Sequence, residues 1–197
     1  MKEYPNIHIR WEGQREQEEE SFASLKTGFA IAMVSMFILL AMQFKSYTQP
    51  LIIMSIIPFA GVVVFFGHAL MGQQLTFISV FGLIALAGIV VNDTIVLVDF
   101  INANIRQNGL SVEEACILAG RRRFRPVMLT TITTVGGLMP ICFETSFQAK
   151  MIIPMAFTMS VGCAGATILT LYLVPVLYSL YDQFSNYMTR TLHLEHD

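Results

Sequence analysis

Residues 77–104 read FISVFGLIALAGIVVNDTIVLVDFINAN, and this stretch decides the fold class. It overlaps the longest uncharged run of the chain, residues 46–92, in which 47 residues include no Asp, Glu, Lys or Arg. A helix needs about 20 mainly apolar residues to cross the hydrocarbon core of a bilayer. The stretch therefore predicts a membrane-spanning helix that is interrupted by an acid, Asp93, and that carries a second acid, Asp99, nearer its end.

Three further uncharged runs of at least 18 residues lie at 27–44, 126–143 and 151–181. Only 13% of the 197 residues are charged, whereas a soluble domain has about 25%. This composition excludes a soluble globular domain and a disordered chain. The three cysteines are widely spaced and odd in number, so they predict neither a disulfide framework nor a zinc site, and we expect no bound metal.

Polar turns and helix breakers divide the apolar sequence into five predicted spans, at 22–44, 50–71, 75–103, 126–143 and 152–180. Ahead of the fourth span, Ser111 and Glu114 have the spacing of a capping box. They predict a short amphipathic helix at 112–120 that lies on the cytoplasmic membrane surface. The predicted fold is an all-α membrane protein whose transmembrane domain, residues 21–181, has five spans and this one surface helix.

Basic residues indicate the orientation of the spans. The segment between the third and fourth spans carries Arg106, Arg121, Arg122, Arg123 and Arg125. Cytoplasmic loops are enriched in Lys and Arg, so this side is predicted to be cytoplasmic. The tail, residues 182–197, is then cytoplasmic, and residues 1–20 are the end of an external region. Five spans behind an external polar arm are typical of the back end of a longer protein.

Asp93 is the residue most expected to carry chemistry. If residues 77–101 are the buried part of the third span, Asp93 lies about four residues, or 6 Å, from the midplane. A carboxylate costs about 2.5–3.5 kcal/mol at the centre of a membrane helix, and such acids mark ion or proton pathways. The alternative is an acid that a neighbouring helix satisfies and that serves only in packing. Asp99 lies nearer the cytoplasmic end, where we expect water to solvate it.

Small and hydroxyl-bearing residues repeat at helical spacing. The fourth span carries a stripe of Thr130, Thr133, Thr134 and Gly137. Such hydroxyls either bond across helices and line a hydrated path, or bond to their own backbone. Close helix packing is predicted at four small residues, Gly88, Ala156, Ser160 and Ala164.

Three stretches taken together resemble one family of membrane proteins. They read GLIALAGIVVNDTIVLVDFIN, RRRFRPVMLTTITTVGGLMP and YLVPVLYSLYD. Their order and spacing are similar to those of the resistance-nodulation-division (RND) efflux transporters, and most similar to the hydrophobe/amphiphile (acriflavin/multidrug resistance) branch. The resemblance covers nearly the whole chain and corresponds to the last five spans of the family, the eighth to the twelfth.

The resemblance implies a proton-driven permease of the bacterial inner membrane. Such permeases are usually homotrimers, and they pass amphiphilic compounds to a periplasmic adaptor and an outer-membrane channel. The resemblance implies no cofactor besides the proton gradient, and a net charge of −2 offers nucleic acid no attraction. The seven earlier spans and the large periplasmic domains lie outside this chain, so we expect it to need the remainder of the permease.

The proton relay of the family lies between its fourth and tenth spans, and the best-studied relays have a lysine on the tenth. Asn92 stands at the place of that lysine, and Asp93 occupies the next position, which is usually Asn. Thr130 and Arg123 fall on a threonine and a cytoplasm-side arginine that the family uses in proton passage. The resemblance therefore implies a proton-coupling set of Asp93, Asn92, Thr130 and Arg123.

Two other classes of protein compete with this interpretation. An intramembrane aspartyl protease needs acids on two facing helices, whereas Asp93 and Asp99 lie on one helix about 120° apart. The chain is therefore not expected to be an enzyme. A structural or regulatory membrane module that pairs with another subunit stays open as an alternative, as does a lipid or metal exporter of the same superfamily.

Overall fold

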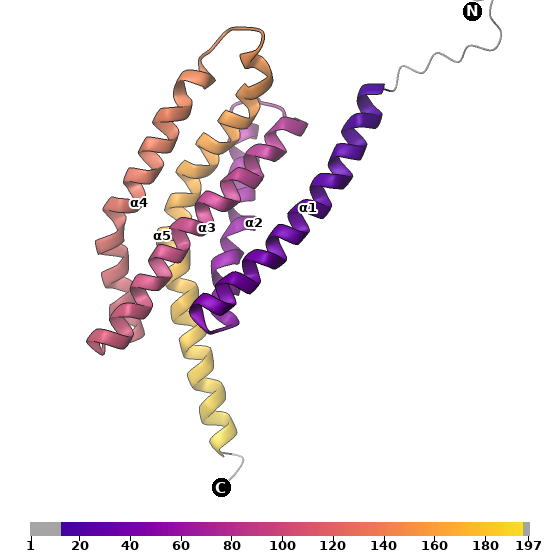
Figure 1. Cartoon of the computed structure of the whole chain (residues 1–197). Coiled ribbons are helices and arrows are strands. Elements are labelled where there is room, and N and C mark those ends of the chain that lie inside the picture. Colours follow the sequence, from indigo (N-terminus) through magenta and orange to yellow (C-terminus); the bar gives the residue numbers. More distant parts are fainter. Residues whose placement is uncertain (1–12, 195–197) are drawn as a thin grey trace, which may run out of the picture. The chain divides into compact units, whose positions relative to one another are not determined.

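The computed structural model describes the backbone of residues 13–194 and the side chains of residues 20–184. This part of the chain folds into five α-helices (Figure 1). They are α1 (Gly13–Phe44), α2 (Thr48–Leu70), α3 (Phe77–Asn108), α4 (Val112–Cys142) and α5 (Ala149–Leu194). The predicted all-α fold class is confirmed.

The chain divides into two units, one that ends at Leu39 and one that begins at Leu40. The first unit contains most of α1. The part of α1 from Glu20 to Phe44 is long and apolar enough to cross a membrane. Its apolar side chains are largely exposed, among them Ile31 and Val34. A helix that is apolar on all sides is typical of a membrane span.

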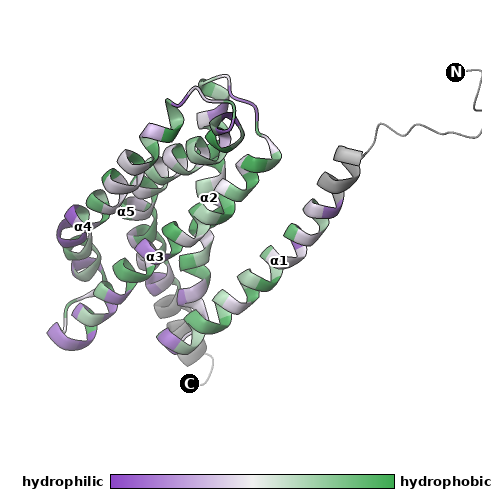
Figure 2. Cartoon of the chain, turned by 45° about the horizontal axis from the view of Figure 1, so that its top comes forward, coloured by the Kyte–Doolittle hydropathy of each residue, from purple (hydrophilic) through white to green (hydrophobic). Residues whose placement is uncertain are grey.

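The second unit is a bundle of the other four helices. α5 packs against α2, α3 and α4, and α3 also packs against α2 and α4. The core contains fully buried Ile53, Ile56, Leu86, Leu97 and Val174. Large apolar side chains also cover the outside of the bundle, where Phe66, Ile132 and Ile168 are exposed (Figure 2). An apolar exterior of this extent suits lipid rather than water.

Four of the described helices are long and apolar enough to cross a membrane. They are Glu20–Phe44, Thr48–Leu70, Phe77–Asn108 and Ala149–Phe184. The predicted first, second, third and fifth spans coincide with these four helices, apart from their last or first few residues. The chain is therefore a multi-pass membrane protein.

The predicted break between a surface helix at 112–120 and a span at 126–143 is wrong, because both segments belong to the continuous helix α4. Pro126 was expected to begin a helix but lies inside one. The residues before it are mostly arginine, a strong helix former, and the proline ring removes only the hydrogen bond to the carbonyl of Arg122. With these charges in its first half, α4 is not among the described helices that are apolar enough to cross a membrane, although it is 31 residues long.

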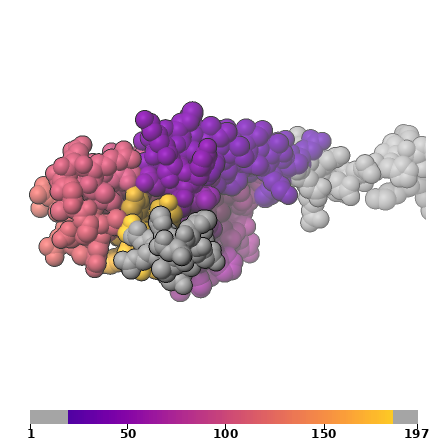
Figure 3. Space-filling view, turned by 90° about the horizontal axis from the view of Figure 1, so that it is seen from below, coloured from indigo at the N-terminus to yellow at the C-terminus, as the bar shows by residue number. Residues whose placement is uncertain are grey.

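The connection between α3 and α4 is fixed by local hydrogen bonds. Gly109 ends α3 with a φ of 64°, a conformation that glycine adopts without strain. Ser111 then begins α4 with the predicted capping box: its backbone N–H donates to Glu114 Oε2 at 3.1 Å, and the Glu114 N–H donates to Ser111 Oγ at 3.3 Å. This connection lies at the same end of the bundle as the first turn of α2 (Figure 3).

Helices in the bundle approach most closely at glycines that the sequence did not single out. A Cβ on Gly82 would lie 2.8 Å from the carbonyl oxygen of Met155 and 2.9 Å from Cβ of Thr158. A Cβ on Gly162 would overlap the side chain of Leu86. These two glycines allow α3 and α5 to touch along the first half of each helix.

Of the four residues predicted to allow close helix packing, two lie inside the bundle and two lie on its exposed surface. Ala156 is buried, and the hydroxyl oxygen of Ser160 is buried without a hydrogen-bond partner. In contrast, Ala164 is exposed, and a Cβ on Gly88 would meet no atom within 4 Å. Gly88 and Ala164 make no close helix contact in the described bundle, because they lie on faces of α3 and α5 that point away from it.

Candidate functional site

Asp93 lies inside the bundle, where α3 packs against α4. The Asp93 side chain is 9% exposed, and its carboxylate oxygen Oδ2 accepts a hydrogen bond of 3.3 Å from Thr130 Oγ1. The same hydroxyl lies 2.8 Å from the backbone carbonyl oxygen of Val127. The fold therefore brings together two of the four predicted proton-coupling residues, which are 37 positions apart in the sequence.

A second set of polar side chains extends from Asp93 toward α5. The hydroxyls of Thr131 on α4 and Thr167 on α5 are hydrogen-bonded to each other, and both residues are buried. Thr167 Oγ1 also donates to the backbone carbonyl oxygen of Cys163 at 2.8 Å. Polar contacts thus join α3 to α4 at Thr130 and α4 to α5 at Thr131, the next residue.

The predicted threonine stripe on α4 is divided between these roles. Thr130 reaches Asp93, whereas the Thr133 hydroxyl is exposed and lies 2.9 Å from the backbone carbonyls of both Leu129 and Thr130. Such bonds to the preceding turn are usual for threonine in a helix. Thr131 was missed because it lies outside the stripe, turned about 100° from Thr130 toward α5.

Asn92 occupies a different face of α3 from Asp93. Its side chain is exposed, as are Gly88 and Asp99, which lie four residues before it and seven residues after it. Thr130 is exposed as well, so the Asp93 site opens onto this face. Polar side chains inside a membrane almost always face other helices or a water-filled cavity. The open face of α3 therefore has the character of a contact surface for further protein.

Arg123 contacts α3 on the cytoplasmic side of Asp93 as the sequence orients the chain. Its guanidinium carbon lies 4.7 Å from the centre of the Phe100 ring, a cation–π contact. The Arg123 Nε atom is buried without a hydrogen-bond partner. The structure therefore holds Arg123 against α3 about two helical turns beyond Asp93, and does not place it in contact with that acid.

A polar cluster that sequence reasoning missed joins α2, α3 and α5. Gln49 Nε2 donates to Asn102 Oδ1 at 3.1 Å and to the Tyr178 hydroxyl at 2.9 Å. Asn102 Nδ2 donates to Gln49 Oε1 at 2.9 Å, and the Tyr178 hydroxyl donates to Asn102 Oδ1 at 2.6 Å. All three residues lie at or next to an end of a predicted span, where polar residues are common. Their spacing in the sequence therefore did not predict that they are in contact.

The chain is a helical membrane protein with a buried acid, Asp93, in one of its membrane-length helices. Acids in such positions generally mark ion or proton pathways. Over residues 2–182 the chain matches the family described as the AcrB/AcrD/AcrF family. The chain therefore belongs to this family of RND efflux permeases.

Solved structures of a heavy metal efflux pump have the same fold. Its crystal form II is 29% identical in sequence and superposes with a TM-score of 0.77, covering 91% of this chain and 18% of the pump. Its crystal form I gives 29% identity and a TM-score of 0.75, covering 90% of this chain and 17% of the pump. The chain thus spans less than one fifth of the length of the pump that it resembles.

Proposed function

We propose that the chain is the C-terminal transmembrane part, spans eight to twelve, of a proton-driven efflux permease of the bacterial inner membrane. In this proposal Asp93 binds and releases the coupling proton, and the permease exports amphiphilic compounds as a member of the hydrophobe/amphiphile branch. The N-terminus is periplasmic and the C-terminus cytoplasmic.

The contact between Asp93 and Thr130 is the observation that carries this proposal. The carboxylate is nearly buried, and among the described residues the side chain that is hydrogen-bonded to it is a hydroxyl. A hydroxyl donates to a carboxylate and accepts from a carboxylic acid, so it suits both protonation states. A structural role alone would be better served by a fixed cation, because an unpaired charge in hydrocarbon is costly.

The open face of α3 supports the need for further spans. Asn92 is exposed on it at membrane depth, and a second helix there would supply partners for its side chain. We propose that the remainder of the permease covers this face, in a homotrimer that works with a periplasmic adaptor and an outer-membrane channel. The chain is proposed not to transport alone.

The test is Asp93→Asn in the complete permease, with efflux of ethidium from de-energised and re-energised cells as the measurement. We expect re-energised efflux to fall at least tenfold, because an amide cannot carry a proton. Asp99→Asn is the matched control, since it makes the same change to an exposed acid on the same helix, and we expect efflux within twofold of the parent. Efflux by Asp93→Asn at the parent rate would refute the coupling role.

A metal exporter is the second candidate, because both solved structures above are of a heavy metal efflux pump. The two candidates differ in the growth defect of a strain that lacks the permease. Sensitivity to ethidium and bile salts with normal growth on silver and zinc salts supports an amphiphile exporter. The reverse pattern supports a metal exporter, and the proposed role of Asp93 is the same in both.

A further inference from the structure

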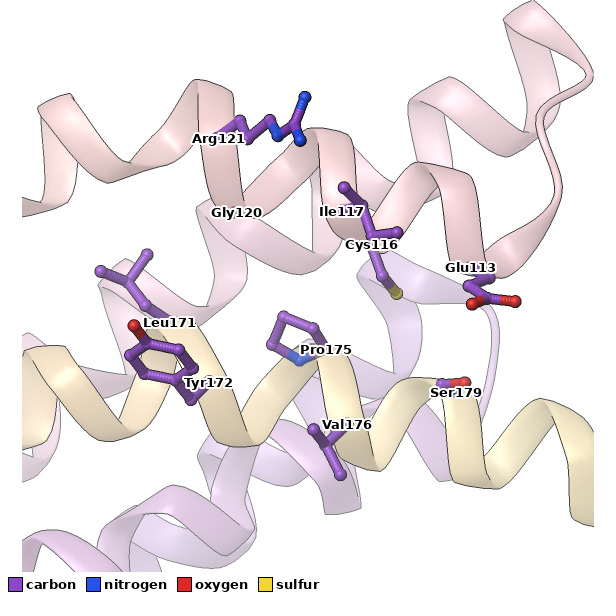
Figure 4. A pocket seen from close by; sticks show the side chains of 10 residues that line it. All are labelled: Glu113, Cys116, Ile117, Gly120, Arg121, Leu171, Tyr172, Pro175, Val176 and Ser179. Carbon is purple, nitrogen blue, oxygen red and sulfur yellow. The ribbon is translucent and has the colours of Figure 1, made fainter.

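Two features of the bundle play no part in the proposed function. One is a pocket of about 430 Å³ between α4 and α5, whose mainly apolar wall has Arg121 near one end and Glu113 at the other (Figure 4). These opposite charges select no particular ligand. The other feature is His68, an ionisable residue that α2 and α5 enclose.

His68 lies in the last turn of α2, and its side chain is 2% exposed. The two helices touch beside it, because a Cβ on Gly67 would overlap the side chain of Val161 on α5. The first turn of α2 lies at the same end of the bundle as the connection between α3 and α4. His68 is therefore at the opposite end, which is external in the proposed orientation.

The hydrogen-bond partners of His68 indicate where its ring carries hydrogen. Nδ1 lies 3.0 Å from the backbone carbonyl oxygen of Val64. A carbonyl oxygen can only accept a hydrogen bond, so Nδ1 carries a hydrogen. On the other side of the ring, Nε2 lies 3.3 Å from the hydroxyl oxygen of Thr158 on α5.

The hydroxyl of Thr158 has a second neighbour, the backbone carbonyl oxygen of Pro154, at 2.7 Å. A hydroxyl has one hydrogen to donate, and Pro154 is the nearer acceptor. The hydroxyl therefore donates to Pro154 and presents a lone pair to His68 Nε2. Nε2 can bond with that lone pair only if it also carries a hydrogen, and an imidazole with hydrogen on both nitrogens is positively charged.

The surroundings of His68 contain no competing charge. Thr158 and Phe157 face it from α5, where the two rings are nearly perpendicular with 4.9 Å between their centres, and α3 approaches Thr158 with Gly82. None of these residues is ionisable. Among residues 20–184, no charged side chain is hydrogen-bonded or ion-paired with His68. The last turn of a helix carries a partial negative charge, which favours a cation there.

We propose that His68 is a proton-binding site in which the imidazolium donates from Nδ1 to Val64 of α2 and from Nε2 to Thr158 of α5. The proton comes from water on the external side and joins the lone pair of Nε2. While it is bound, it ties the last turn of α2 to α5. When it leaves, two lone pairs face each other unless the Thr158 hydroxyl turns away from Pro154, so external acid tightens this end of the bundle.

This site uses neither Asp93 nor Thr130, so it stands whether or not Asp93 carries the coupling proton. Nuclear magnetic resonance of the detergent-solubilised protein, with ¹⁵N-labelled histidine and any chain that remains bound, tests it. His68→Gln identifies the His68 signals among those of the four histidines. We expect both ring nitrogens of His68 to carry hydrogen at about pH 5 and one of them to lose it by about pH 8, the range in which histidine changes its charge.

Thr158→Val removes the acceptor for the Nε2 hydrogen and keeps the shape of the side chain. We expect His68 in this variant to hold hydrogen on one nitrogen only at about pH 5. Thr170→Val makes the same change at another buried threonine of α5 and should leave the His68 signals as in the parent. Circular dichroism confirms that each variant keeps its helices.

Hydrogen exchange of the last two turns of α2 gives a second measurement. After correction for the intrinsic rates, these amides should exchange about fivefold more slowly at about pH 5 than at about pH 8, the effect of one added hydrogen bond. In His68→Gln the corrected rates should be equal at the two pH values. Three results would overturn the proposal: a single N–H on His68 at about pH 5 in the parent, an unchanged His68 in Thr158→Val, or the same pH dependence of exchange in His68→Gln.

Discussion

The hydroxyl of Thr130 lies 3.3 Å from a carboxylate oxygen of Asp93 and 2.8 Å from the backbone carbonyl oxygen of Val127. It therefore has two acceptors within reach. When Asp93 is ionised, the hydroxyl donates to it; when Asp93 is protonated, the hydroxyl accepts the acid proton and donates to Val127. Both protonation states of Asp93 keep a hydrogen bond without any movement of the helices.

Thr130→Val tests this arrangement because it keeps the shape of the side chain and removes the hydroxyl. In the complete permease we expect ethidium efflux to fall at least tenfold, in line with the roughly 1.5–3 kcal/mol of a hydrogen bond to a charged group. Thr130→Ser restores the hydroxyl and should keep at least half of the parent rate. An equal loss in both variants would show that the methyl group, and not the hydroxyl, is what matters.

The Thr131–Thr167 contact is predicted to stabilise the packing of α4 against α5. A double-mutant cycle with Thr131→Val and Thr167→Val, measured by unfolding in detergent and SDS mixtures, should give a coupling energy of about 0.6–1.7 kcal/mol, the range found for hydrogen bonds between membrane helices. The pair of Thr133→Val with Thr167→Val is the control, since Thr133 bonds only to its own helix. A coupling energy of zero for Thr131 and Thr167 would contradict the contact.

The four membrane-length helices and the presence of an acid within the third could be predicted from the sequence, because long uncharged runs and an acid within them are local patterns. The resemblance placed Thr130 and Asp93 in one proton-coupling set, and the two side chains are in contact in the bundle. Thr167 and the cluster of Gln49 with Tyr178 could not be predicted, because each contact joins residues of distant segments. Such pairing depends on how the helices pack, which spacing within one helix does not encode.

The break predicted within α4 is wrong for a related reason, because local sequence patterns do not show how a helix packs against its neighbours. The polar segment and Pro126 predicted a break in the helix, but the helix propensity of the arginines and packing in the bundle favour a continuous α4.

The residues predicted to allow close helix packing also show this limit of the sequence. Gly88 and Gly82 are both glycines of α3, but only Gly82 faces α5 closely, and the sequence alone does not reveal which face is covered.

Gly82→Ala is predicted to destabilise the bundle by about 1–3 kcal/mol, the usual range for overpacking. Its new methyl group would lie 2.8 Å from the carbonyl oxygen of Met155, a backbone atom that cannot easily move. Gly88→Ala is the matched control on the same helix, and it should be neutral or stabilising by up to about 1 kcal/mol through helix propensity. Unfolding in detergent and SDS mixtures measures both, and equal stability of the two variants would contradict this packing.

Tyr178→Phe is predicted to loosen the attachment of α2 to α3 and α5. It removes one hydroxyl that accepts from Gln49 and donates to Asn102, so we expect a loss of about 1–3 kcal/mol, because polar groups of the cluster lose their partner. Hydrogen exchange of the second turn of α2, whose amides are hydrogen-bonded within the helix, should increase at least tenfold. Tyr172→Phe, which removes the hydroxyl of a tyrosine that is 74% exposed on the same helix, is the control and should leave exchange unchanged.

The Cys116 thiol is predicted to resist alkylation at neutral pH. Burial raises its pKa to about 11 from 9.0, and the negative charge of Asp182 adds to the increase. The thiolate is the reactive form, so a pKa two units higher leaves about a hundredfold less of it at pH 8.

In a Cys142→Ser, Cys163→Ser background, the iodoacetamide labelling rate of the folded protein should rise about tenfold per pH unit up to pH 10. The SDS-unfolded chain should instead level off near pH 9. Asp182→Asn removes only the smaller cause, so its profile should shift to lower pH by less than the full difference. A folded profile that levels off with the unfolded one would show that α4 and α5 do not enclose Cys116.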